Sequence, residues 1–255
     1  MKRTLLRIMT LALMGCGGSK LGSRLEYEVY EVPHPLLGGE AGSCLSRHSM
    51  YYSEIKAFKW AIGCQLEVYA SWPDRGDCSS SILGSPRCPN VPADVITLNS
   101  AAWNAQLTGS AAVAVVAVRA VGTGDGGFAV RANGDAFNPD FVLTASSFSD
   151  IWFERANGPG YTDVIPGRIS ELRLALGQDA AVAVTLRNAA GEHLCGPVPA
   201  TLSTSGNVFS VERLGDGDFV NLPYRVIAGT AAGEGSLQFT AGVVSATLHI
   251  IVGGP

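Results

Sequence analysis

The sequence predicts an all-β protein, and three observations lead to that prediction. Glycine is abundant, with 31 residues in a chain of 255, while only 16% of the residues are charged. Valine, alanine and threonine recur in runs that alternate with polar residues, which is the pattern of half-buried strands. Clusters of Gly, Asp, Asn and Ser separate these runs and suit the tight turns that many short strands require.

Residues 1–15 have the composition of an export signal. Lys2, Arg3 and Arg7 surround the start of a short apolar run, residues 8–14. This run is too short to cross a bilayer, for which about 20 apolar residues are needed. A basic start, a brief apolar stretch and a small-residue exit are the marks of a secretory signal peptide. We therefore expect residues 1–15 to be removed during export; the alternative is an ordinary apolar N-terminal helix of a cytosolic protein.

The exit of this run, Leu13-Met14-Gly15-Cys16, resembles the lipobox of bacterial lipoproteins. In that family the resemblance implies transfer of a diacylglycerol to the sulfur of Cys16, cleavage just before it and acylation of the new amino terminus. Two or more acyl chains hold a protein stably on a membrane. The resemblance therefore implies a lipid anchor at Cys16, and residues 16–24 then form a flexible tether.

The expected location is the bacterial cell envelope. Gly17 is not the aspartate that retains some Gram-negative lipoproteins at the inner membrane, so the resemblance favours the outer membrane, on its periplasmic or surface face. Without residues 1–15 the chain has 15 basic and 22 acidic residues, a net charge of −7. This acidity argues against nucleic acid as a partner. The expected partners are the membrane, through Cys16, and an envelope protein or polysaccharide.

Residues 25–165 are predicted to form a mainly β region that contains cysteines. Residues 25–32, "LEYEVYEV", alternate apolar and acidic side chains, which predicts a half-buried strand. Residues 64–72, "CQLEVYASW", alternate in the same way and also predict a strand. Residues 54–63 before them are compatible with either a helix or a strand.

Cysteine usage fits an exported protein. Apart from Cys16, the cysteines are Cys44, Cys64, Cys78, Cys88 and Cys195. An oxidising compartment would pair the first four as two disulfides, for which three pairings exist. Short loops favour Cys44–Cys64 and Cys78–Cys88, the second stapling the turn-rich loop of residues 74–92. We expect Cys195 to be a buried thiol, with a bridge to the N-terminal half as the alternative.

Residues 111–132 contain the sharpest reversal signal in the first half of the chain. Two Val/Ala-rich runs flank "GTGDGG", residues 122–127. The two runs form either one hairpin or the last strand of one domain and the first of the next. In the second case residues 25–165 divide near residue 121 into two units.

Residues 166–255 are predicted to form a separate domain, because Pro166 breaks strand pairing and Gly167 frees the chain. Seven short alternating runs follow: residues 170–176, 181–187, 199–204, 209–214, 221–228, 236–241 and 244–252. Seven such strands in fewer than 100 residues are the expectation for an immunoglobulin-like (Ig-like) sandwich.

Three stretches of this region resemble bacterial Ig-like domains: "VAVTLRNAAGEHL", "LSTSGNVFSVE" and "GEGSLQFTAGVVSATLHIIV". The resemblance implies the fold and leaves the activity open, since sites are grafted onto folds. A weaker echo lies upstream, where residues 133–153 can be laid over residues 190–209 at a spacing of 57. It makes a further Ig-like unit the alternative for the region before residue 166.

No catalytic pattern is found in the sequence, so we predict neither an enzyme nor a cofactor. The chain has no nucleophile elbow, P-loop or dinucleotide fingerprint. Cys44, His48 and Cys64 lack the paired spacing of a structural zinc site, and "GTGDGG" and "GDGD" suit turns better than calcium loops, so no metal is expected.

The sequence therefore predicts a non-catalytic, membrane-anchored binding, adhesion or envelope-structural module. The alternative is a carbohydrate-binding or enzyme-accessory lipoprotein that uses exposed aromatic side chains. The candidates for such a platform are Trp60, Trp72, Trp103, Trp152, Tyr51 and Tyr52. For any single tryptophan a place in the core of a sandwich is the simpler expectation.

Overall fold

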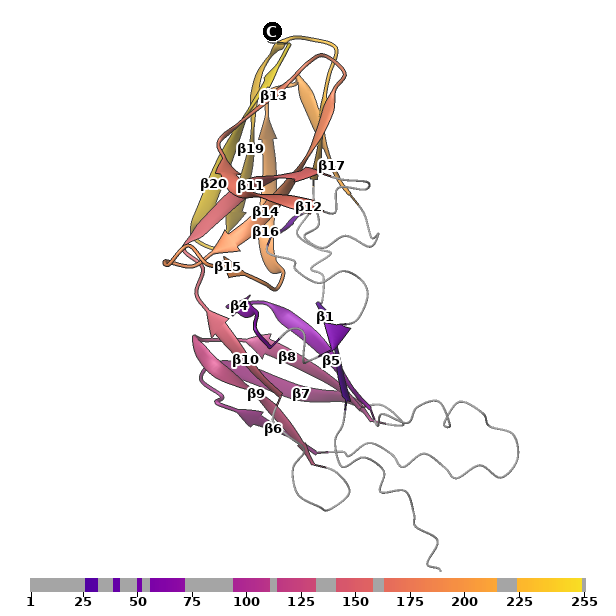
Figure 1. The fold of residues 1–255 in the computed structure, drawn as a ribbon, viewed down its shortest axis with the longest axis vertical. Helices are drawn as coiled ribbons and strands as arrows, with labels where there is room; N and C mark the ends of the chain where they lie inside the picture. Colours follow the sequence, from indigo (N-terminus) through magenta and orange to yellow (C-terminus); the bar gives the residue numbers. More distant parts are fainter. Residues whose placement is uncertain are drawn as a thin grey trace, which may run out of the picture.

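A computed structural model gives the fold, and it describes residues 26–31, 39–41, 50–51, 56–71, 94–110, 114–131, 141–157, 163–214 and 224–253. Every regular element among these residues is a strand, so the all-β prediction is confirmed. The strands form four sheets, which pack in pairs as two sandwiches stacked end to end (Figure 1).

The first sandwich is one Ig-like unit. One sheet has the order β3-β1-β5-β8-β7 and the other β4-β10-β9-β6. Their bounds are β1 Glu26–Glu31, β3 Met50–Tyr51, β4 Lys59–Ala61, β5 Gln65–Ser71, β6 Asp94–Leu98, β7 Trp103–Ser110, β8 Ala114–Ala120, β9 Gly124–Arg131 and β10 Phe141–Ser146. The order β1-β5-β8-β7 facing β10-β9-β6 is the ABED and GFC arrangement of the immunoglobulin fold. Residue 121 lies between β8 and β9 of this unit, so the alternative of a domain split there is wrong.

The second sandwich repeats this arrangement. One sheet has the order β12-β11-β14-β18-β17, with β15 paired to β14, and the other β13-β20-β19-β16-β2. Their bounds are β2 Gly39–Ala41, β11 Asp150–Asn157, β12 Asp163–Ile169, β13 Glu171–Leu174, β14 Asp179–Arg187, β15 His193–Leu194, β16 Val198–Ser205, β17 Phe209–Arg213, β18 Tyr224–Ala228, β19 Gly233–Ala241 and β20 Val244–Val252. All seven strands expected after residue 166 are present, and the Ig-like prediction for this region is confirmed.

The second sandwich begins earlier than the sequence suggests. β11 pairs with β14 over seven residues, from Asp150 opposite Arg187 onward, and β12 pairs with β11. The expected boundary at residue 166 therefore falls inside β12. Pro166 is tolerated there because β12 is the edge of its sheet and needs no ladder bond on its outer side.

The core of the second sandwich consists of the residues that alternation points to. Leu237, Phe239, Leu248 and Ile250 on β19 and β20 are fully buried. Phe239 lies edge-on to Phe153 from the opposite sheet, with ring centroids 5.9 Å apart. The apolar side chains on the inner faces of these strands are all buried, and they include Leu172, Leu174, Val182, Val184, Leu186, Leu237, Phe239, Leu248 and Ile250.

The core of the first sandwich is built around an aromatic cluster. The ring of Tyr27 lies edge-on to those of Phe128 and Phe141, at centroid distances of 5.8 and 5.4 Å. Phe128 and Phe141 stack at 4.8 Å. Trp103 is fully buried as well, and its indole N–H donates to the carbonyl of Gly124 at 3.3 Å.

One strand departs from the order of the chain. β2 follows β1 of the first sandwich in the sequence, yet it pairs antiparallel with β16 of the second. Figure 1 shows it as a short indigo segment beside β16. The N-terminal part of the chain therefore covers an edge of the C-terminal sheet.

Candidate functional site

The two sandwiches meet at a junction where the backbone of β4 bonds to both of them. On one side β4 pairs in parallel with β10. On the other, the N–H of Ala61 donates to the carbonyl of Cys195 and the N–H of Cys195 donates to the carbonyl of Lys59, both at 2.7 Å. The ammonium of Lys59 also donates to the carboxylate of Glu192 at 2.5 Å. β4 is therefore a strand of the first sandwich whose backbone also forms a parallel bridge to the second.

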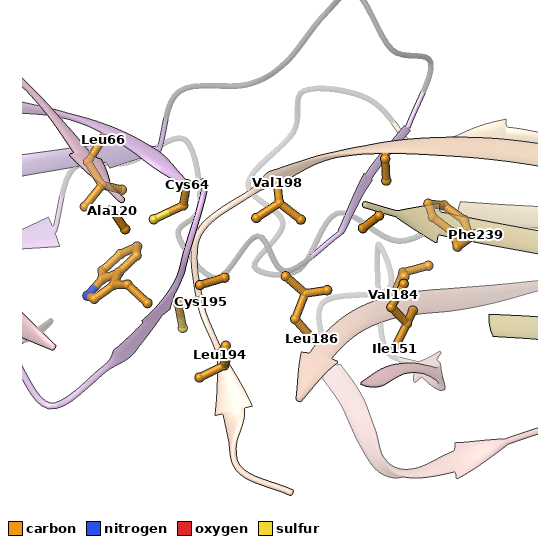
Figure 2. Packing of buried hydrophobic residues seen from close by; sticks show 14 of the residues in the cluster. Cys64, Leu66, Ala120, Ile151, Val184, Leu186, Leu194, Cys195, Val198 and Phe239 are labelled. Atoms are coloured by element: carbon orange, nitrogen blue, oxygen red, sulfur yellow. The ribbon is translucent and has the colours of Figure 1, made fainter. Parts of the chain in front are cut away.

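Side chains from both sandwiches close the junction. Cys64, Leu66 and Ala120 approach from the first sandwich, and Leu194, Cys195 and Val198 from the second (Figure 2). These residues belong to one buried hydrophobic cluster that runs through both units. Because the packing is continuous, the two sandwiches form one elongated body.

Gly196 fits this junction because it has no side chain. Its φ is +94°, a conformation that favours glycine. A Cβ atom there would lie 2.5 Å from the Cβ of Cys64, 2.7 Å from its sulfur and 3.1 Å from the ring of Trp60. The two sandwiches therefore lie so close together at Gly196 that a methyl group does not fit between them.

A buried ion pair lies on the sheet of β11, β12 and β14. Glu154 is 1% exposed, and one nitrogen of the Arg187 guanidinium donates to both of its carboxylate oxygens at 2.9 Å. The hydroxyl of Thr185 donates to one oxygen at 2.6 Å and the N–H of Gly167 to the other at 3.0 Å. Both oxygens of Glu154 are therefore hydrogen-bonded.

The electrostatics of this pair favour the charged state. Burial alone would raise the pKa of Glu154, but the hydrogen bonds from Thr185 and Gly167 and the charge of Arg187 outweigh it and hold the pKa below its ordinary value. Burial and the charge of Arg187 lower the pKa of His193, against the opposing effect of Glu154. A carboxylate with a lowered pKa whose two oxygens already accept hydrogen bonds is a poor base. The role of the ion pair is therefore structural, and it links neighbouring strands of the sheet.

Trp152 lies beside this pair. The Arg187 guanidinium carbon is 4.7 Å from the centroid of its ring, a cation–π contact. The indole N–H of Trp152 donates to Asp150 at 2.9 Å, and Asp150 also accepts from Arg168 at 2.9 Å. Trp152 is half-buried in this network.

Two expectations about the cysteines are wrong. Cys64 is fully buried as a thiol at the junction, so the expected pairing of Cys44 with Cys64 does not hold. Cys195 is disulfide-bonded, where a buried thiol was expected. Cys16, Cys44, Cys78 and Cys88 lie outside the described residues.

Two of the candidate platform tryptophans belong to the core. Trp60 and Trp103 are fully buried, and neither presents a face to solvent. Trp72 and Tyr52 lie outside the described residues, as does the side chain of Tyr51. An aromatic platform made of the tryptophans would therefore lack two of its four members.

A pair of half-buried tyrosines was missed by the sequence analysis. The rings of Tyr30 on β1 and Tyr69 on β5 lie 4.9 Å apart. Their hydroxyls donate to Glu28 at 3.4 Å and to Glu67 at 3.3 Å. Burial, followed by the nearby charge of Glu67, raises the pKa of Tyr69. The signal was the repeated Glu-x-Tyr spacing, which places both residue types on one face of a strand.

This face, which we call the tyrosine–glutamate face, comprises Glu28, Tyr30, Glu67 and Tyr69. It lies on the side of β1 and β5 opposite the core, because Val29 and Val68 between these residues are fully buried. Glu28 is opposite Tyr69 and Tyr30 is opposite Glu67 in the ladder. The face thus combines two aromatic rings with two carboxylates.

The described part of the chain offers neither a metal-binding cluster nor a membrane-spanning helix. No group of three or more His, Cys, Asp and Glu side chains within it could hold a metal ion. None of its elements is a helix long and apolar enough to cross a bilayer.

Comparison with known proteins gives similarity to surface proteins at low identity. No protein-family model matches the sequence, and no curated protein matches it. The alignment with domains 4 and 5 of the S-layer protein SbsC covers 91% of this chain and 100% of the SbsC chain, with 13% sequence identity and a TM-score of 0.31. The alignment with the Escherichia coli adhesin FdeC covers 77% of this chain and 62% of the FdeC chain, with 15% sequence identity and a TM-score of 0.29. The alignment with invasin, described as a bacterial integrin-binding protein, covers 89% of this chain and 39% of the invasin chain, with 12% sequence identity and a TM-score of 0.28. Similarity at this level does not identify a function.

Proposed function

We propose that this protein is a non-catalytic, lipid-anchored module of the bacterial cell envelope that acts in binding, adhesion or envelope structure. The observation that carries the proposal is the junction, where β4 bonds to both sandwiches and one buried cluster runs through them. A protein built in this way holds its two Ig-like units at a fixed distance and angle. Such rigidity suits a module that displays a surface away from a membrane.

Two further observations support the envelope location. The sequence places a lipobox-like motif before Cys16, and Gly17 after it favours the outer membrane. The disulfide at Cys195 supports an oxidising compartment, because such bonds persist in secreted and periplasmic proteins and are rare in the cytosol.

The anchor is tested by replacing Cys16 with Ser in the full chain expressed in a Gram-negative host. Labelling with a fatty-acid analogue should mark the wild type and the Cys64→Ser control and leave Cys16→Ser unlabelled. The Cys16→Ser protein should also leave the membrane fraction. Equal labelling of wild type and Cys16→Ser would refute the anchor.

The tyrosine–glutamate face favours a second candidate function, the binding of an envelope polysaccharide. Sugar rings stack on aromatic faces, and carboxylates accept hydrogen bonds from sugar hydroxyls. Tyr30 and Tyr69 supply the rings. In a sedimentation assay with peptidoglycan sacculi, Tyr30→Ala and Tyr69→Ala should each release the protein, whereas Val243→Ala, at a fully exposed position of the other sandwich, should not. Equal sedimentation of all variants would exclude this ligand.

A further inference from the structure

The two sandwiches carry comparable side chains on the outer faces of equivalent strands. β1 and β5 hold the same places in the strand order of the first sandwich as β11 and β14 hold in the second. On β11, one residue separates Trp152 from Glu154, and one residue likewise separates the tyrosine from the glutamate on each of β1 and β5. The separating residues are Phe153, Val29 and Val68, and all three are buried in the core. Each aromatic side chain and its carboxylate therefore lie on the side of the sheet opposite the core.

In the second sandwich a guanidinium completes this arrangement. Arg187 on β14 places its guanidinium carbon 4.7 Å from the centroid of the Trp152 ring. One nitrogen of the same group donates to both carboxylate oxygens of Glu154 at 2.9 Å. The cation thus contacts an aromatic face and a carboxylate together, and both attract it, the first through the ring quadrupole and the second through its charge.

The tyrosine–glutamate face of the first sandwich has aromatic rings and carboxylates in the equivalent place. Glu28 and Glu67 occupy two diagonal corners of a square, and Tyr30 and Tyr69 occupy the other two. Arg119 on β8 lies on the same side of the sheet, one rung beyond Glu67. Within the part of the chain that the structure describes, neither glutamate is ion-paired to a lysine or an arginine.

The square is small enough for one cation to reach all four side chains. Facing Cβ atoms of an antiparallel pair are about 4.5–5.5 Å apart, and diagonal ones are about 7–8 Å apart. The rings of Tyr30 and Tyr69 lie 4.9 Å apart at an interplanar angle of 67°. Each carboxylate accepts one tyrosine hydroxyl, at 3.4 Å in Glu28 and 3.3 Å in Glu67, and keeps capacity for further donors. A cation above the centre is within the reach of about 6 Å that cation–π contacts have.

The charge of the face identifies the ligand that complements it. Two half-buried carboxylates on neighbouring strands repel each other, and a bound cation relieves this repulsion, whereas a neutral sugar does not. The whole chain is acidic as well, with a net charge of −4, and attracts cations at long range. A polysaccharide of amino sugars offers a ring that stacks on tyrosine and an ammonium that both carboxylates attract.

We propose that the tyrosine–glutamate face binds the protonated amino groups of an envelope polysaccharide, with the ammonium held between rings and carboxylates as the Arg187 guanidinium is held in the second sandwich. The proposal rests on the second candidate function, the binding of a polysaccharide by this face, and adds the charge of the ligand. It requires the face to distinguish an amino sugar from its N-acetylated form, because acetylation removes the positive charge and keeps the ring.

A pair of matched oligosaccharides tests the proposal. The full chain carrying Cys16→Ser would be titrated calorimetrically with a glucosamine oligomer and with an N-acetylglucosamine oligomer of equal length, in a mildly acidic buffer that protonates the free amino groups. The glucosamine oligomer should bind about 5- to 20-fold more tightly, and added salt should reduce the difference. Glu67→Gln should weaken its binding about 2- to 5-fold. Glu234→Gln, which removes an exposed carboxylate of the second sandwich, should not.

A variant that supplies its own cation gives the converse test. Ala117 on β8 lies opposite Glu67. Ala117→Arg should remove the preference for glucosamine, whereas Ala117→Gln, a polar change without charge, should keep it. Equal binding of both oligomers to the wild type would overturn the charged ligand and leave polysaccharide binding standing, and binding of neither would overturn both. An oligolysine peptide that binds more tightly than the glucosamine oligomer, and is weakened by Glu67→Gln, would overturn the proposal in favour of a basic protein segment.

Discussion

Replacing Gly196 with alanine should destabilise the junction more than the same change at an open glycine. Gly196 has φ +94°, and a left-handed residue other than glycine costs about 1–2 kcal/mol. The new Cβ would also lie 2.5 Å from the Cβ of Cys64, and overpacking of this kind costs about 1–3 kcal/mol. The expected loss in free energy of unfolding is therefore about 2–5 kcal/mol.

Gly191 is the matched control. Its φ is +77°, and a Cβ there would have no atom within 4 Å, so Gly191→Ala should lose only the backbone contribution of about 1–2 kcal/mol. Urea unfolding of both variants, followed by tryptophan fluorescence and far-UV circular dichroism, gives the two losses. Equal losses would refute the tight contact at Gly196 and with it the rigid junction.

Three further results are expected. Leu248→Ala removes a fully buried side chain and should lower the free energy of unfolding by about 2–5 kcal/mol, against a change within about 0.5 kcal/mol for Val243→Ala. Glu154→Gln should make stability depend less on pH in the acid range. Because the pKa of Glu154 is lowered in the folded protein, the ionised carboxylate stabilises the fold above the ordinary pKa of 4.5, and this contribution is lost as the pH falls through the pKa of the folded state. Urea midpoints of the wild type that do not change from pH 5 to pH 3 would contradict this. A fragment of residues 168–253 lacks β11 and should give no cooperative melt by circular dichroism; a sharp melt would show that β11 is dispensable.

The C-terminal strands could be predicted because their alternation is local. Leu237, Phe239, Leu248 and Ile250 alternate with polar residues, and all four are buried. β2 could not be predicted, since "GEA" has no strand pattern and forms a strand only because the edge of β16 is available to it. The early start of the second sandwich was missed because Pro166 suggests a break, which an edge strand accommodates.

The contacts that define the candidate site were beyond sequence reasoning because they join distant residues. Glu154 and Arg187 are 33 residues apart and meet only because β11 pairs with β14. Cys64 likewise packs beside Gly196, a residue far from it in the sequence. The echo at a spacing of 57 lays β10 on β16, and these strands hold different places in their sandwiches. The repeated unit is instead the strand order, β1-β5-β8-β7 in one sandwich and β11-β14-β18-β17 in the other.

The antiparallel ladders at the two ends of the body determine how it would respond to a mechanical pull. β1 enters the first sandwich at Glu26, at the end remote from the junction, and β20 leaves the second at Val252, also remote from it (Figure 1). A pull between these two residues runs along both strands, so it shears the β1–β5 and β19–β20 ladders. All the hydrogen bonds of a sheared ladder bear the force together, whereas a pull across the strands would open them one after another. This geometry would let the protein bear tension applied between the two ends of its body.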